Sequence, residues 1–241
     1  TFRNASVILC VSNYLHKYVS AHGGRRMITN YNRVYLSQFL QTETSRPPRE
    51  LFTVLCVMRL DRQKNPECLL RAVHATQGVR LKLIGQGELE ERSKVLAREL
   101  EIEDRVEFIP MVPNTEIHRH YQDADIFALA TYYEGFCIPI LEAMAAALPV
   151  VACATDPIPE LLGDTGMIVD MDPEAFASAF ARLAADADLR QTMGQRARQR
   201  AMSFDGAVME EREAEIFSAY MADDKAAIDR ILSPKYRYIQ P

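Results

Sequence analysis

The hydrophobic positions of the chain fall into short runs separated by polar stretches. Two of these runs, at residues 125–130 and 149–153, are too brief to form helices of their own. Short apolar runs of this kind predict buried strands of a parallel sheet. The stretch between them is predicted to be a loop that leads into a helix. Pro139 suits the first helical position, because its φ is fixed near the helical value and its missing N–H would have been unpaired there.

The same alternation of strand and helix patterns continues along most of the chain. Strands are expected at residues 51–57, 79–84, 105–109, 125–130, 149–153 and 165–169. Helices are expected at residues 65–76, 88–100 and 116–123, from Pro139, from about residue 155 and throughout the tail from residue 173. Alternating strands and helices predict an α/β fold, a Rossmann-like parallel sheet with helices on both faces. Ligands of such sheets bind beyond the carboxyl ends of the strands.

The first forty residues predict a separate, smaller unit. A strand at 6–12, a helix at 13–21 and a strand at 26–30 form a β-α-β pattern that is too small to cover two sheet faces alone. We therefore expect most of a first domain to be missing from this sequence. The predicted division is a remnant of that domain at 1–41, a proline-containing linker at 42–50, a main domain at 51–222 and a helical tail at 223–241.

Composition and charge narrow the classes of function. The chain has 241 residues, 48% of them hydrophobic, which is ordinary for a water-soluble domain. Its net charge of −5 argues against a broad nucleic-acid-binding surface. The five cysteines show no metal-ligand spacing and no disulfide framework, which fits a reducing cytoplasm. No apolar run approaches the length of a membrane span.

Two glutamates flank the expected start of the helix at Pro139. Glu134 lies in the preceding loop, and Glu142 is expected in the first helical turn. A helix N-terminus offers unpaired N–H groups and partial positive charge to an anion such as phosphate, and carboxylates accept hydrogen bonds from sugar hydroxyls. An anion together with hydroxyls describes a nucleotide sugar. The alternative interpretation is that both glutamates only complement the helix dipole.

The spacing of the two glutamates carries a family resemblance. Seven residues separate Glu134 from Glu142, in the setting Glu-Gly-Phe-x-x-x-x-Leu-Glu-Ala-Met-Ala followed by Pro-Val-Val. This resembles the E-x7-E signature of the retaining glycosyltransferases of family four, which have the GT-B fold. The resemblance extends from about Phe52 to Tyr220. It implies transfer of a sugar from a nucleoside diphosphate to a hydroxyl acceptor with retention of the anomeric configuration.

The resemblance also assigns roles to residues. The stretch from Met58 to Asn65 resembles the Gly-Arg-Leu-x-x-x-Lys-Gly/Asn segment of that family, so Arg59 and Lys64 are expected to hold the donor diphosphate. Fixed cations there stabilise the charge that develops on the leaving diphosphate. The expected catalytic residues are Glu134, Arg59 and Lys64. The expected substrate-binding residues are Arg59, Lys64, Gly85, Pro110, Met111, Glu134, Gly135, Phe136, Cys137, Ile138, Leu141 and Glu142.

Several other interpretations stay open at this stage. Gly85 and Gly87 form part of a dinucleotide-binding fingerprint, but Glu90 stands where its third glycine belongs, which weakens a dehydrogenase assignment. Asp123 and Asp125 have the spacing of the Asp-x-Asp metal site of other glycosyltransferases. The chain could also be a nucleotide-sugar-binding module without transfer activity, or another GT-B enzyme such as a phosphorylase or an epimerase.

The sequence departs from the family pattern where close backbone approach matters. Met58, Cys137 and Ala147 stand at positions where the family usually has glycine, and Asp156 stands where a Gly-Gly pair is frequent. The side chains of Cys137 and Asp156 are expected to narrow the donor pocket.

The expected partners follow from the resemblance. They are a nucleoside-diphosphate sugar, an acceptor with a hydroxyl group and the missing N-terminal domain. No cofactor, no metal and no nucleic acid are expected. The protein is expected in the cytoplasm, with any membrane association made through the missing half.

Overall fold

The main domain is a parallel sheet with helices on both faces, as the sequence predicts. The computed structural model of the protein describes residues 2–40 and 51–233, so the predicted linker 42–50 and residues 234–241 of the predicted tail lie outside the described residues. The sheet has six strands in the order β5-β4-β3-β6-β7-β8, all parallel. Their bounds are Phe52–Val57 (β3), Val79–Ile84 (β4), Val106–Ile109 (β5), Ile126–Leu129 (β6), Val150–Cys153 (β7) and Met167–Val169 (β8).

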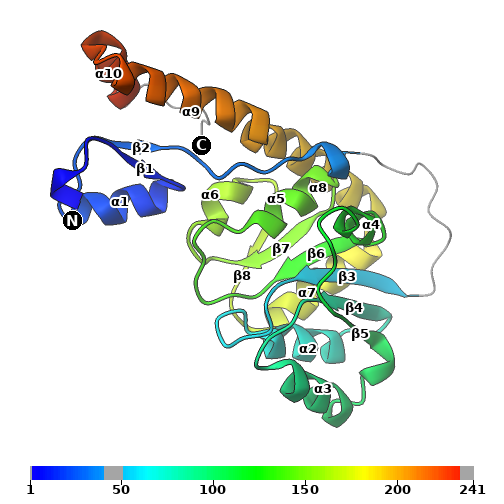
Figure 1. Cartoon of the computed structure of the whole chain (residues 1–241). Helices are drawn as coiled ribbons and strands as arrows, with labels where there is room; N and C mark the ends of the chain where they lie inside the picture. The colour runs from blue at the N-terminus through cyan, green and yellow to red at the C-terminus, as the bar shows by residue number, and fades with distance from the viewer. Residues whose placement is uncertain (1, 41–50, 234–241) are drawn as a thin grey trace.

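Helices cover the sheet in two layers (Figure 1). One layer contains α2 (Pro66–Ala75), α3 (Glu90–Glu99) and α7 (Pro173–Ala185), and the other contains α4 (Ile117–Gln122), α5 (Ile138–Ala145), α6 (Ile158–Leu162) and α8 (Ala187–Ala201). Short 3-10 turns lie at Phe2–Asn4 (η1), Ser37–Phe39 (η2), Glu103–Arg105 (η3) and Met202–Phe204 (η4). Because the helices cover only the two faces of the sheet, the connecting loops lie at the two ends of the strands.

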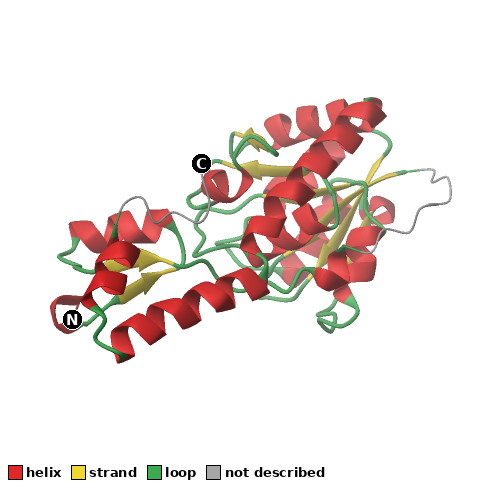
Figure 2. Ribbon diagram, turned by 90° about the horizontal axis from the view of Figure 1, so that it is seen from above, coloured by secondary structure: helices red, strands yellow, loops and turns green. Residues whose placement is uncertain are grey.

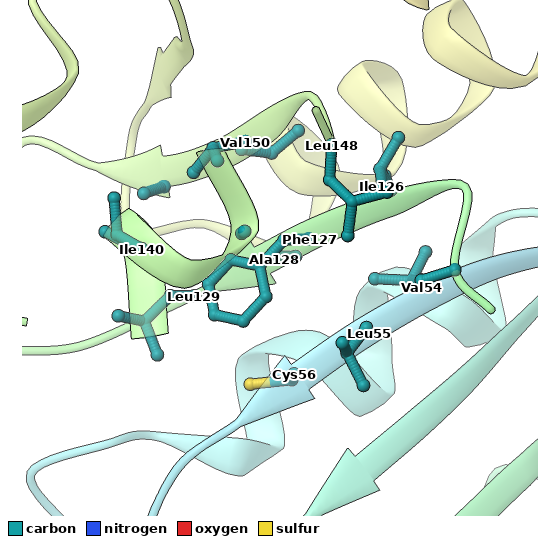
Figure 3. Packing of buried hydrophobic residues seen from close by; sticks show 14 of the residues in the cluster. Val54, Leu55, Cys56, Ile126, Phe127, Ala128, Leu129, Ile140, Leu148 and Val150 are labelled. Atoms are coloured by element: carbon teal, nitrogen blue, oxygen red, sulfur yellow. The ribbon is translucent and has the colours of Figure 1, made fainter. Parts of the chain in front are cut away.

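The core lies between β3, β6, β7 and the helix α5. Val54, Leu55 and Cys56 of β3 are completely buried, and so are most residues of the neighbouring strands. Figure 3 shows these side chains packed against β6, α5 and the start of β7, with Val54, Leu55, Cys56, Ile126, Phe127, Ala128, Leu129, Ile140, Leu148 and Val150 labelled. The short apolar runs of the sequence are therefore central strands buried on both faces, which explains their lack of alternation. The central position of β3 and β6 fixes the loops that follow them.

The N-terminal residues form the small β-α-β unit that the sequence predicts. β1 (Ile8–Cys10) and β2 (Met27–Thr29) pair in parallel, and α1 (Asn13–Ala21) connects them. The C-terminal helices α9 (Gly206–Met221) and α10 (Lys225–Leu232) lie next to this unit in both views (Figures 1 and 2). No helix within residues 2–40 and 51–233 is long and apolar enough to cross a membrane.

The last two described helices contact the N-terminal unit. A second apolar cluster consists of Ile28 from β2, Ile216 and Ala219 from α9, and Ile231 from α10. The second half of α9 therefore packs with the N-terminal unit rather than with the main domain. The buried residues of α9 recur every three or four positions and so lie on one face, but the sequence does not show which surface covers that face.

Residues 30–40, which follow β2, pack against the main domain. Tyr31, Val34, Leu36 and Phe39 belong to the core of the main domain. The ring of Phe39 meets the ring of Tyr121 edge-on at a centroid distance of 5.3 Å. Residues predicted as part of a remnant domain thus complete the packing of the main domain.

Candidate functional site

The carboxyl ends of β3 and β6 define the candidate site. These two strands are neighbours at the centre of the sheet, and the chain leaves them toward opposite edges. Such a topological switch point is where open α/β sheets bind ligands, because the two departing loops leave a crevice between them. The loop after β3 carries Arg59 and Lys64, and the loop after β6 carries Glu134 and leads into α5. The structure therefore brings the two predicted segments to one edge.

Lys64 and Glu134 are in direct contact. The Nζ atom of Lys64 donates a hydrogen bond to Oε1 of Glu134, and the side chains are only 14% and 6% exposed. A buried ion pair forgoes hydration, and the mutual attraction of its charges compensates for that loss only when the geometry is good. This pair places a buried cation and a buried carboxylate side by side at the carboxyl edge.

Arg59 lies on the same loop but is more open to solvent. Its guanidinium pairs with Asp61 at 3.0 Å, and its side chain is 71% exposed. Asp61 also accepts a hydrogen bond from the backbone N–H of Lys64 at 3.1 Å. Asp61 therefore connects both predicted cations. Asp61 is not among the predicted site residues, although it lies in the same loop after β3 as Arg59.

Hydrogen bonds from backbone and side-chain donors hold the two loops together. The N–H of Tyr132 donates to the carbonyl of Gln63 at 2.9 Å, and Nε2 of Gln63 donates to the carbonyl of Tyr133 at 2.6 Å. The hydroxyl of Thr131 donates toward the carbonyls of Gln63 and Tyr133 at 3.3 and 3.2 Å. Gln63 and Thr131 thus position Lys64 and Glu134 relative to each other. Neither is charged, and no sequence signal identified them.

The turn that leads from Glu134 into α5 has a left-handed backbone at Cys137. Its φ of 77° is a conformation that glycine adopts freely and other residues adopt at a cost. The Cys137 side chain is buried in the core, and burial raises the pKa of its thiol. The prediction that Cys137 narrows a donor pocket therefore conflicts with the direction of its side chain, which packs inward. Ile138, the first residue of α5, is 39% exposed.

Glu142 lies further along α5 than the sequence suggested. The helix begins at Ile138, so Pro139 is its second residue and Glu142 lies beyond its first turn. Oε2 of Glu142 accepts a hydrogen bond from the hydroxyl of Tyr121 on α4 at 2.7 Å. Burial raises the pKa of Glu142, and the hydrogen bond from Tyr121 opposes that rise. An acidic side chain complements the helix dipole mainly in the first turn, so the dipole explains Glu142 less well than it would explain an acid in that turn.

The glycines after β4 meet the backbone of the β3 loop. Gly85 has a φ of 136°, and a Cβ atom there would lie 1.9 Å from the carbonyl oxygen of Met58. A Cβ atom at Gly87 would lie 2.3 Å from the carbonyl oxygen of Leu60. The N–H of Leu60 donates to the carbonyl of Gln86 at 3.0 Å. Close packing of the β3 and β4 loops therefore requires both glycines, whether or not a nucleotide binds there.

The remaining predicted residues differ in their accessibility. Pro110 and Met111 follow β5 at the same edge, and Met111 is 77% exposed. Gly135 has open space where a Cβ atom would stand. Phe136 is only 4% exposed and the side chain of Leu141 is completely buried, so the structure gives both side chains a packing role.

The Asp-x-Asp pair lies at the other end of the sheet. Oδ2 of Asp125 accepts a hydrogen bond from the N–H of Thr53 at 2.8 Å, at the start of β3. Asp123 pairs with Lys82 of β4 at 3.4 Å. Both aspartates thus bind protein groups near the amino edge, away from the candidate site. Within residues 2–40 and 51–233, no three His, Cys, Asp or Glu side chains are grouped so as to hold a metal ion.

Comparison with known proteins assigns the family. Residues 38–200 match the family model described as glycosyl transferases group 1. The chain belongs to this family of glycosyl transferases. Among curated relatives, the D-inositol 3-phosphate glycosyltransferase of Corynebacterium jeikeium is 38% identical over 162 residues, which cover 61% of this chain and 39% of that protein. The enzyme of the same name from Corynebacterium diphtheriae is 35% identical over 188 residues, which cover 72% and 44%.

Solved structures of glycosyl transferases share the GT-B fold with this family member. Sucrose-phosphate synthase from Thermosynechococcus elongatus superposes with a TM-score of 0.83 at 24% identity, covering 92% of this chain and 60% of that one. Anabaena Alr3699/HepE, solved in complex with UDP and glucose, superposes with a TM-score of 0.80 at 22% identity. The match covers 90% of this chain and 64% of that one. At these identities the likeness shows the fold alone. The chain spans less than half the length of the curated relatives named above.

Proposed function

We propose that this chain is the donor-binding part of a glycosyltransferase that moves a sugar from a nucleoside diphosphate to a hydroxyl group with retention of configuration. The buried Lys64–Glu134 pair at the switch point of the sheet is the observation that carries this proposal. It joins a cation suited to a phosphate with a carboxylate suited to sugar hydroxyls. Family membership and the UDP complex of a structural neighbour support the same assignment.

The diphosphate would bind between the β3 loop and the start of α5. Arg59 can grip two phosphate oxygens, and Lys64 has three donors, so it can retain Glu134 while donating to a phosphate. The first amides of α5 add partial positive charge where the leaving group develops negative charge. These groups stabilise the departing diphosphate in our proposal without a metal ion.

Glu134 would hold sugar hydroxyls rather than attack the sugar. Its carboxylate is engaged by the ammonium group of Lys64, which makes it a poor nucleophile but leaves lone pairs free to accept hydrogen bonds. We propose that the acceptor hydroxyl attacks from the side of the leaving group, so that no covalent intermediate with the protein forms. Glu142, beside Tyr121, is proposed to bind the ribose of the nucleotide.

Replacement of Glu134 tests this assignment. In the longest natural form of the protein, Glu134→Ala should abolish sugar transfer while sparing the binding of the free nucleoside diphosphate. Calorimetry with UDP, GDP and ADP measures binding, and release of the diphosphate in the presence of an acceptor measures transfer. Unchanged turnover in Glu134→Ala contradicts the role of Glu134. The anomeric configuration of the product, read by NMR, tests retention separately.

A binding module without transfer activity is the second candidate. Its support is the limited span of the chain, which matches 39% and 44% of the two relatives named above. Tight nucleotide-sugar binding without sugar transfer in the longest natural form of the protein would favour this candidate.

A further inference from the structure

The carboxylate of Glu160 connects the N-terminal unit to the main domain. Glu160 of α6 accepts hydrogen bonds from the backbone N–H of Asn13, at 2.8 Å to Oε1 and 3.1 Å to Oε2. The N–H of Tyr14 lies 3.3 Å from Oε2. The hydroxyl of Tyr31 donates to Oε1 at 2.7 Å. Glu160 therefore faces the start of α1 and the end of β2 from an element of the main domain.

Capping of α1 does not by itself account for this contact. Ser12 is already the N-cap of α1, and its hydroxyl accepts a hydrogen bond from the N–H of Leu15 at 3.1 Å. The added carboxylate of Glu160 interacts favourably with the positive end of the α1 dipole. The bond to Tyr31 does something else, because it fixes the position of a large buried ring.

That ring packs against the turn of the candidate donor site. Tyr31 is 5% exposed, and its ring centroid lies 6.0 Å from that of Phe136 and 5.1 Å from that of Phe204. Phe136 stands between Gly135 and Cys137, in the turn that leads from Glu134 into α5. Burial and the bond to Glu160 raise the pKa of Tyr31, so its hydroxyl stays a hydrogen-bond donor at neutral pH. Tyr31 thus links Glu160 to the donor turn.

A second connection reaches the other end of the same loop. Thr155, in the segment that leads into α6, donates from its hydroxyl to the carbonyl of Thr131 at 2.7 Å. Thr131 in turn donates to the carbonyl of Tyr133, next to Glu134. The segment that carries Glu160 therefore touches the beginning of the Glu134 loop directly and its end through Tyr31.

We propose that Glu160 and Tyr31 are positioning residues of the donor site, which hold the turn at residues 135–137 in the conformation that receives the diphosphate. This inference rests on the proposed function for its ligand. Neither residue is placed in contact with the donor. The contacts of the N-terminal unit would thereby set the affinity of the main domain for the diphosphate.

Tyr31→Phe tests the proposal with little change in packing, because it keeps the ring and removes the hydroxyl. Tyr35→Phe is the matched control: the hydroxyl of Tyr35 also donates to a glutamate, Glu210 on α9, at 2.5 Å, and the residue is 59% exposed. Hydrogen exchange of residues 134–141 should become about three- to tenfold faster in Tyr31→Phe and stay unchanged in Tyr35→Phe, because a charge-assisted support of the turn is lost only in the former.

Binding gives the second readout. The affinity of Tyr31→Phe for the best-binding nucleoside diphosphate should fall about three- to tenfold, because the supported turn contacts the diphosphate. Affinity for the monophosphate of the same base should change less. A merely structural role would weaken both alike. Glu160→Gln should reproduce the Tyr31→Phe pattern in both readouts.

Unchanged hydrogen exchange at residues 134–141 in Tyr31→Phe and Glu160→Gln overturns the inference. An equal loss of monophosphate and diphosphate affinity in these two variants overturns it as well. If the unaltered chain binds no nucleoside diphosphate, the proposed function fails, and hydrogen exchange alone then decides this inference.

Discussion

The two ends of the six-stranded sheet carry similar charges but use them differently. At the carboxyl edge, Lys64 and Glu134 are both buried, with side chains 14% and 6% exposed. Near the amino edge, the side chain of Lys82 is also only 10% exposed, but its acidic partners Asp123 and Glu107 are 59% and 56% exposed. The carboxyl edge thus keeps both charges of its ion pair out of water, beside a helix N-terminus. Near the amino edge, water solvates the acidic partners of the buried lysine. The comparison teaches that a buried partner, more than a buried lysine, marks the candidate site.

The largest effect should come from removing the two lysines in turn. Lys64→Met leaves Glu134 buried without its partner, which should lower the free energy of unfolding by about 3–5 kcal/mol. Lys82→Met leaves an exposed aspartate that water solvates, and should cost less than about 1 kcal/mol. Urea unfolding of both variants measures the difference. Equal losses would remove the distinction between the two edges.

Lys64→Met should also weaken diphosphate binding. The loss of a charged hydrogen bond, worth about 1.5–3 kcal/mol, corresponds to about 10- to 100-fold in affinity. Lys82→Met should leave this affinity unchanged, since Lys82 pairs with Asp123 near the amino edge. Calorimetry with UDP, GDP and ADP on both variants provides the measurement.

Two glycines that flank β4 give the next comparison. Gly85 follows β4 at the carboxyl edge, and an added Cβ atom would meet the carbonyl oxygen of Met58 at 1.9 Å. Gly78 precedes β4 at the amino edge with a φ of 71°, and nothing lies within 4 Å of an added Cβ atom. Gly85→Ala should destabilise by about 2–4 kcal/mol, through strain and a backbone clash, and Gly78→Ala by about 1 kcal/mol, through strain alone. Thermal unfolding of the two variants ranks them, and the reverse order would refute the packing role of Gly85.

Glu142 predicts a smaller, pH-dependent effect. Burial raises its pKa in the folded state, so the native protein holds this proton more tightly than the unfolded chain does. The resulting stabilisation is complete below the unfolded pKa and is lost as the pH rises through the folded pKa. Glu142→Gln should remove this loss. Urea unfolding from pH 4 to pH 8 should therefore show a shallower decline in the variant, and identical slopes would contradict the shift.

The smallest effect is expected at Ala147, after the end of α5. Its φ of 56° is left-handed, and Leu148 N donates back to the carbonyl of Ala143 at 3.0 Å, as at a helix C-terminus that favours glycine. Ala147→Gly should raise the free energy of unfolding by about 0.5–1 kcal/mol. A lower stability would show that packing of the methyl group outweighs the strain.

The strands and helices, and the residues that lie at the carboxyl edge of the sheet, could be predicted from the sequence. Central strands such as β6 are buried on both faces, so their apolar runs are unmistakable, and parallel topology then places Lys64 and Glu134 at one edge. The ion pair itself was not predicted. Its formation depends on Gln63 and Thr131, whose backbone and side-chain bonds follow from tertiary packing and leave no pattern in the sequence.

Long-range contacts account for what the sequence did not reveal. Glu160 lies in the first turn of its own helix, where an acidic side chain complements the helix dipole, yet its carboxylate binds the start of α1. Helix α9 falls within the predicted main domain, yet Ile216 packs with Ile28 of β2. In both cases local chemistry fixes the type of contact, and only the fold supplies the partner.

A crystal structure of this chain with the nucleoside diphosphate that binds it best tests the central claim most directly. We expect the phosphates within hydrogen-bonding distance of Arg59 and of Nζ of Lys64, at the start of α5, with Glu134 still bound to Lys64. A diphosphate seated at the amino edge beside Asp125 would contradict the account.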